Sequence, residues 1–253
     1  MSIYSIYFSP TGGTKNVMDI LADELGNTET IDLCERTTDF SAYKLNAEDI
    51  CLVGVPSFGG RVPGTAIERL KQIQGNGAKA VAVIVYGNRA YEDTILELKN
   101  EMEAAGFHVI AGIAALAEHS ILRQFAAGRP DAQDKEVLKS YMDTIKERLA
   151  SGNLPDTIEV PGNMPYKPFH VVPLHPTGSE ACVKCGLCVP ACPVGAIPEE
   201  DPSSVDHELC ISCRKCVAVC PNNARDVDQN LLAGLNEKLK VFAAGRKENE
   251  LFL

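Results

Sequence analysis

Two identical cysteine spacings, 28 residues apart, carry the most specific chemistry in this sequence. Each copy has three cysteines separated by two residues, then a fourth that is followed by proline. The first copy is Cys182-x2-Cys185-x2-Cys188-x3-Cys192-Pro193, and the second is Cys210-x2-Cys213-x2-Cys216-x3-Cys220-Pro221. Thiolates at this spacing ligate [4Fe-4S] clusters, so the duplication predicts two such clusters.

The fourth cysteine of each copy is expected to serve the cluster of the other copy. Three cysteines on one tight loop can reach three irons of one cubane, whereas the cysteine before proline points toward the second cluster. One predicted ligand set is therefore Cys182, Cys185, Cys188 and Cys220. The other is Cys210, Cys213, Cys216 and Cys192.

Two other uses of dense cysteines fit this pattern less well. Structural zinc sites use two separated C-x2-C pairs, not a triple followed by Cys-Pro. Disulfides require an oxidising compartment, and the N-terminus has neither the basic flank nor the small-residue cleavage site of a secretory signal. The sequence thus favours a cytoplasmic location and iron–sulfur ligation.

The cysteines also divide the chain. Only Cys34 and Cys51 lie outside the dense block, so we expect one module at 1–150 and a cysteine-rich module at 178–253. The intervening segment 151–177 is rich in proline and has no apolar period, which predicts a semi-extended linker. A leucine-rich stretch predicts a short closing helix, and the charged tail after Gly245 is expected to be frayed.

Residues 1–150 alternate strand-like and helix-like patterns. Fully apolar strands between amphipathic helices indicate a parallel sheet that is covered on both faces, and the size fits a flavodoxin-like, doubly wound α/β fold with five strands. The predicted strands are Ile3–Phe8, Thr30–Leu33, Ile50–Val55, Ala80–Tyr86 and Val109–Ala117.

The loop after the first strand has the composition of a phosphate cradle. Hydroxyls and glycines stand just before a helix N-terminus, where free N–H groups and the helix dipole favour an anion. The residues predicted to bind are Ser9, Thr11, Gly12, Gly13 and Thr14. This loop resembles the S/T-x-T-G-x-T loop with which flavodoxins hold the phosphate of FMN. Every position that this motif defines is matched, by Ser9, Thr11, Gly12 and Thr14.

Two further loops would meet the first where the strand order reverses, at the carboxyl ends of the strands. The third strand is followed by Pro56, Ser57, Phe58, Gly59 and Gly60, and the fourth by Tyr86, Gly87, Asn88 and Tyr91. The resemblance implies that these residues hold the flavin ring, with Phe58 and Tyr91 as stacking candidates. Asn88 stands where flavodoxins usually have aspartate, and the chain has no tryptophan.

The cysteine-rich segment resembles the bacterial two-[4Fe-4S] ferredoxins, with all eight ligands and both Cys-Pro pairs present. The whole chain resembles a flavodoxin–ferredoxin fusion of the kind found in anaerobic bacteria and archaea. This resemblance implies an electron carrier that couples non-covalent FMN to two clusters and exchanges electrons with redox proteins. The alternative is a flavin-dependent reductase, whose clusters feed an FMN that meets substrate directly.

Two observations weigh on that choice and on the partners. The sequence shows no obvious acid–base cluster near the three loops beyond His119, in a long loop after the fifth strand, which favours the carrier. The net charge of −10 makes nucleic acid a poor partner and suits basic proteins. No run of apolar residues is long enough for a membrane span, and the sequence does not determine the oligomeric state.

Overall fold

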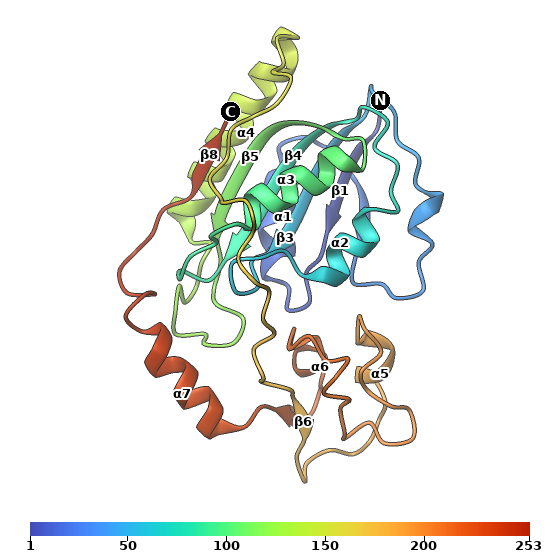
Figure 1. Cartoon of the computed structure of the whole chain (residues 1–253), viewed down its shortest axis with the longest axis vertical. Helices are drawn as coiled ribbons and strands as arrows, with labels where there is room; N and C mark the ends of the chain where they lie inside the picture. Colours follow the sequence, from blue (N-terminus) through green and yellow to red (C-terminus); the bar gives the residue numbers. More distant parts are fainter.

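The computed structural model describes residues 1–253 and is built around one six-stranded sheet (Figure 1). Strand order is β2-β1-β3-β4-β5-β8, with the first five strands parallel. Their bounds are β1 Ile3–Tyr7, β2 Glu29–Asp32, β3 Ile50–Pro56, β4 Lys79–Tyr86 and β5 His108–Leu116. The order 2-1-3-4-5 is flavodoxin-like, so both the fold class and the five predicted strands are confirmed, with ends shifted by one residue.

Helices cover both faces of the sheet because each buries an apolar stripe. On one face α1 packs on α4, with Val17, Met18, Leu138 and Met142 fully buried against the strands. On the other face α2 packs on α3. The bounds are α1 Gly13–Asp23, α2 Gly64–Leu70, α3 Thr94–Ala104 and α4 Ala132–Ser151, with a single 3-10 turn, η1, at Phe40–Ala42. No helix is long and apolar enough to cross a membrane.

The C-terminal tail corrects one expectation. Instead of fraying, it forms a short strand, β8 at Glu250–Phe252, which pairs antiparallel with β5. Asn249 anchors its start, because its side-chain oxygen accepts from the N–H of Leu116 at 2.8 Å and its amide donates to Asp134. The tail is charged, but the bonds of Asn249 and the pairing of β8 with β5 fix it to the sheet.

The proline-rich segment is docked on the first module. Asp93 holds it, accepting from the backbone N–H groups of Asn163 at 2.9 Å and Lys167 at 2.7 Å. Burial raises the pKa of Asp93, but these N–H donors outweigh burial and lower it. The carboxylate is therefore charged, and the segment has a fixed path beside α3.

The cysteine-rich part contains little regular structure of its own. A two-stranded ribbon joins β6, Thr177–Gly178, to β7, Arg225–Asp226. Single helical turns, α5 at Cys188–Ala191 and α6 at Lys215–Ala218, pack on each other. The predicted closing helix is α7, Gln229–Leu239, which begins at the side-chain cap of Asp228.

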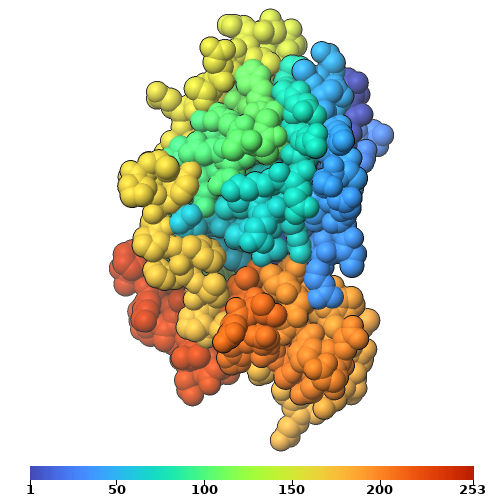
Figure 2. Space-filling model, turned by 45° about the vertical axis from the view of Figure 1, so that its right-hand side comes forward, coloured from blue at the N-terminus to red at the C-terminus, as the bar shows by residue number.

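The cysteine-rich part lies against the sheet at the carboxyl ends of the parallel strands (Figures 1 and 2). Arg69 of α2 links the two, since its guanidinium donates to the carbonyls of Leu33 and Pro193 at 2.6 and 2.5 Å. The chain then leaves through α7 and returns to the sheet as β8. The cysteine-rich part is thus connected to the first module at both of its ends.

Candidate functional site

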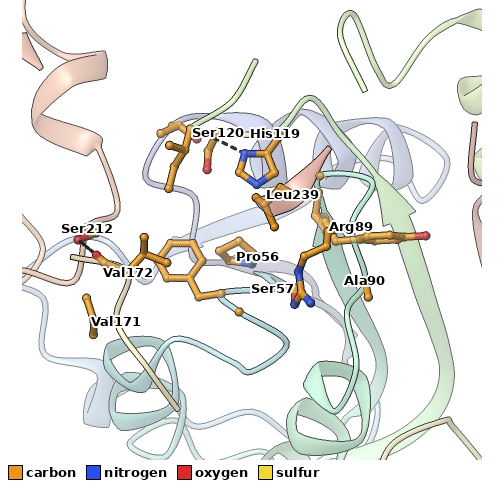
Figure 3. Close-up of a pocket in the computed structure, with 18 of the residues that line it drawn as sticks. Pro56, Ser57, Arg89, Ala90, His119, Ser120, Val171, Val172, Ser212 and Leu239 are labelled. Carbon is orange, nitrogen blue, oxygen red and sulfur yellow. Dashed lines mark hydrogen bonds between the residues drawn. The ribbon is translucent and has the colours of Figure 1, made fainter. Parts of the chain in front are cut away.

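A cavity of about 390 Å³ opens at the carboxyl ends of β1, β3 and β4. This is the point where the strand order reverses, which is the usual ligand crevice of open α/β sheets. Figure 3 shows side chains from several loops surrounding it. The predicted site residues that line it are Thr11, Gly13, Thr14, Pro56, Ser57, Phe58, Gly59, Tyr86 and Gly87.

The first loop is shaped for an anion. Gly12 adopts a left-handed φ of 90° as the residue before α1, and a Cβ there would meet no atom within 4 Å. The first N–H groups of an α-helix have no acceptor within the helix. In α1 the N–H of Lys15 donates to the Ser9 hydroxyl at 2.8 Å. Ser9 and Gly12 therefore shape the turn from outside the cavity, and Thr11, Gly13 and Thr14 face it.

The second loop is a tight turn from Phe58 to Arg61, whose backbones exchange hydrogen bonds of 2.9 and 3.2 Å. Gly59 and Gly60 have φ of 61° and 88°, which side chains disfavour. Gly59 lines the cavity, whereas Gly60 lies behind the turn. A Cβ on Gly60 would stand 1.7 Å from a carboxylate oxygen of Glu92, so glycine is required for packing as well as for conformation.

The third loop departs from the expectation. Tyr91 does not line the cavity; its ring packs edge-on against Tyr86, and its hydroxyl donates to Glu250 of β8 at 2.9 Å. Asn88 is buried and donates to the carbonyls of Ala243 and Gly245, both at 2.7 Å. Both residues hold the returning C-terminal segment. Of the two aromatic stacking candidates, the structure brings only Phe58 to the cavity.

The outer wall was missed by the sequence analysis. It comes from residues 167–172 of the proline-rich segment, from Leu235 and Leu239 of α7, and from Ile211 and Ser212 in the cysteine-rich part. Arg89, Glu118 and His119 add polar groups from the first module. No local pattern marks the residues of the proline-rich segment, α7 and the cysteine-rich part, because they reach the cavity only through the docking of segments that are distant in the sequence. Arg89, Glu118 and His119 instead follow β4 and β5 closely, and His119 lies in the long loop that the sequence indicated.

The cysteines fall into two groups. A second, smaller cavity is lined by Cys182, Cys185, Cys188 and Cys220, together with Arg225. On the other side, burial is the main cause that raises the pKa of the Cys210, Cys213 and Cys216 thiols, and the nearby Cys192 sulfur raises each further. No three His, Cys, Asp or Glu side chains converge as tightly as the ligands of one metal ion.

The two Cys-Pro turns are built alike. The Cys192 sulfur accepts from the N–H of Ala196 at 3.3 Å, and the Cys220 sulfur accepts from that of Ala224, also at 3.3 Å. Arg225 is buried, and its guanidinium lies 3.9 Å from the Cys188 sulfur. The guanidinium also donates to backbone carbonyls, which include that of Pro176. A buried cation beside thiolates offsets their negative charge.

Comparison with known proteins supports this division of the chain. Residues 181–224 match the family model of the 4Fe-4S dicluster domain, which carries two clusters. No curated protein matches the chain. The chain therefore joins a flavodoxin-like domain, as its strand order shows, to a 4Fe-4S dicluster domain.

Solved flavodoxins resemble the first module. A flavodoxin of Streptococcus pneumonia TIGR4 is 19% identical and covers 58% of this chain and 99% of its own, with a TM-score of 0.43. Flavodoxin 2 of Bacillus cereus is 15% identical, with 58% and 99% coverage and a TM-score of 0.45. A Fusobacterium nucleatum flavodoxin bound to flavin mononucleotide is 15% identical, with 58% and 98% coverage and a TM-score of 0.42.

Proposed function

We propose that this chain is an electron-transfer protein that holds FMN in the large cavity and exchanges electrons between it and two [4Fe-4S] clusters. One observation carries the proposal. Ile211 and Ser212 lie between the cysteines Cys210 and Cys213, and they line the same cavity as Thr11 of the phosphate-type loop. The proposed flavin site and the proposed cluster-binding loop thus share a wall.

The residues of the cavity fit FMN. Its volume of about 390 Å³ lies within the range of small-molecule sites, roughly 300–1,000 Å³. The hydroxyls of Thr11 and Thr14 and the N-terminus of α1 suit a phosphate. Phe58 offers an aromatic face at the apolar wall, and Gly59 lets the backbone come close to a planar ring. A bound flavin would supply two-electron chemistry at this place.

The cluster ligands are proposed as two crossed sets. Cys182, Cys185, Cys188 and Cys220 would hold one cluster, and Cys210, Cys213, Cys216 and Cys192 the other. The shared cavity of the first four and the influence of Cys192 on the second group support this pairing. The N–H groups of Ala196 and Ala224 would stabilise the thiolates of the two Cys-Pro turns, and Arg225 would offset the charge between the sets.

The composition of the purified protein tests the cofactors. Anaerobically purified full-length chain should contain one FMN and about eight irons with eight labile sulfides. Zinc in place of iron after anaerobic reconstitution would contradict the cluster assignment. FAD, or no flavin, would contradict the assignment of the cavity.

The coupling itself needs a kinetic test. Oxidised protein is mixed anaerobically with less than one equivalent of dithionite, and the flavin and cluster absorbances are followed as electrons redistribute between them. Transfer within one molecule should give a rate that does not depend on protein concentration. A rate proportional to concentration would show exchange only between molecules and would overturn the coupling.

A further inference from the structure

His119 occupies a fixed position over the large cavity. Its backbone N–H donates to the carbonyl of Phe125 at 3.1 Å, and the two rings pack edge-on at 6.3 Å. On the other side lies Gly87, where a Cβ would stand 2.6 Å from the Cβ of His119. The loop after β5 and the missing side chain of Gly87 together fix the position of the imidazole (Figure 3).

The hydrogen bonds of the ring determine which nitrogen carries a proton. Nδ1 accepts from the backbone N–H groups of Ile121 at 3.1 Å and Leu122 at 3.0 Å. Backbone N–H groups can only donate, so Nδ1 must present its lone pair. The proton of the neutral ring is then on Nε2. That nitrogen has no partner within the chain, and the residue lines the cavity.

The ring is uncharged near neutral pH. Burial lowers the pKa of His119 to about 4, and the positive charge of Arg89 adds to this effect. The other charged or titratable groups on the cavity wall are Tyr86, Glu118, Lys167 and His170. Glu118 forms an ion pair with Arg123, and Lys167 forms one with Glu92. Neither group is among the causes that shift the pKa of His119.

We propose that His119 is a ligand-binding residue of the large cavity, which donates from Nε2–H to a carbonyl oxygen of the bound heteroaromatic ring. As a neutral donor with a fixed tautomer, it binds and orients that ring and does not deliver a proton to it. The role rests on the proposed flavin function, because the isoalloxazine is the carbonyl-bearing ring expected there. It gives the long loop after β5 a contact with the ligand that the three β–α loops do not provide.

Two conservative variants separate this role from a structural one. Asparagine places its amide oxygen near the position of Nδ1, so His119→Asn keeps the acceptor for Ile121 and Leu122 but loses the donor that reaches the cavity. Glutamine places its amide near the position of Nε2, so His119→Gln keeps that donor and loses the internal acceptor. A residue that only holds the loop would tolerate asparagine better than glutamine.

The test is titration of FMN into the flavin-depleted full chain, followed by quenching of flavin fluorescence. Loss of one neutral hydrogen bond should weaken FMN binding by about three- to tenfold in His119→Asn, whereas His119→Gln should stay close to the unmodified protein. Equal weakening in both variants, or weakening only in His119→Gln, would overturn the proposal. If the unmodified chain bound no FMN, the flavin function itself would fail, which is a separate result.

Nitrogen-15 NMR of the imidazole gives a readout that needs no turnover. Between about pH 8 and 5.5, above the lowered pKa, Nδ1 should keep an unprotonated shift and Nε2 a protonated one. The Nε2 proton should move downfield when FMN is added. A titration near the ordinary pKa of histidine, about 6.5, or a proton on Nδ1, would contradict the fixed neutral donor.

Discussion

The hydroxyl of Ser212 donates to the carbonyl of Val172 at 2.6 Å, and both residues line the large cavity. Ser212 is buried, with a left-handed φ of 54°, so its direction is fixed by the turn between Cys210 and Cys213. This single bond joins the cluster-binding loop to the proline-rich segment at the edge of the cavity. The distance between the proposed flavin site and the proposed cluster sites therefore depends on contacts of this kind.

Replacing Ser212 with alanine should loosen this junction. A hydrogen bond of this type contributes about 0.5–1.5 kcal/mol, so the docked arrangement would be less populated. We expect the first-order exchange between flavin and clusters to slow several-fold, with both absorption spectra unchanged. Ser140→Ala is the matched control, because Ser140 also donates its hydroxyl to a backbone carbonyl but at an exposed position of α4. An equal rate in the two variants would mean that this junction does not govern exchange.

Thr11→Val should weaken FMN binding while leaving the clusters intact. The change keeps the shape of the side chain but removes a hydroxyl donor to the phosphate, a loss on the order of 1–3 kcal/mol. Affinity from fluorescence titration should fall by about fivefold or more. The cluster absorbance of the same sample is the internal control. Unchanged affinity would make Thr11 an ordinary turn residue.

Gly60→Ala should damage the second loop. The new methyl group would collide with Glu92, which cannot move freely because Arg89 and Lys167 both bond its carboxylate. Because this collision adds to the unfavourable φ of 88°, the free energy of unfolding should fall by about 1–3 kcal/mol.

Gly64→Ala is the control for that change, since Gly64 begins α2 and a Cβ there meets no atom within 4 Å. Chemical denaturation of both variants, followed by far-ultraviolet circular dichroism, measures the difference. If Gly60→Ala were as stable as Gly64→Ala, the turn would be more adaptable than its packing indicates.

Cys192→Ala should disturb the cluster of the second cysteine copy, although Cys192 belongs to the first copy in sequence. The measurement is the paramagnetically shifted resonances of cysteine β-protons, assigned by residue. We expect shifts at Cys210, Cys213 and Cys216, while Cys182 and Cys185 change little. The reciprocal variant, Cys220→Ala, should show the opposite pattern. Perturbation confined to the first copy in Cys192→Ala would refute crossed ligation.

Asn249→Ala should destabilise the sheet. The variant leaves the buried N–H of Leu116 without an acceptor, which costs about 1–3 kcal/mol. It also removes one of the donors to Asp134, whose carboxylate keeps its bonds with Arg129. Thermal or denaturant unfolding should show the loss. Asn230→Ala, at an exposed position early in α7, is the comparison that should change stability little. Equal stability of the two would show that the Asn249 side chain does not stabilise the fold.

The sequence predicted what local pattern encodes. Strands such as Lys79–Tyr86 and helices such as Ala132–Ser151 carry their own apolar periods, and the cysteine spacing is a property of a few adjacent residues. The turn before α1 that lines the cavity could be located for the same reason, since Thr11 to Thr14 are consecutive.

The remainder depends on distant contacts. Tyr91 was a predicted stacking residue because of its place after a strand. Its hydroxyl instead donates to Glu250, which lies far along the chain, and this bond holds the side chain outside the cavity. The strand Glu250–Phe252 has three residues and no readable period, so only its partner β5 defines it. The docking of the proline-rich segment depends on Asp93, whose bonding partners lie about seventy residues later.

The return of the chain to β5 has a topological consequence. The chain connects the cysteine-rich part to the first module at both ends, through the proline-rich segment and through β8, so this part is placed as an insertion and not as an appended tail. A protease that cuts once between residues 152 and 176 would give two fragments that remain associated. The pairing of β8 with β5 and the hydrogen bonds of Asn88 would hold them together. Release would need a second cut beyond α7.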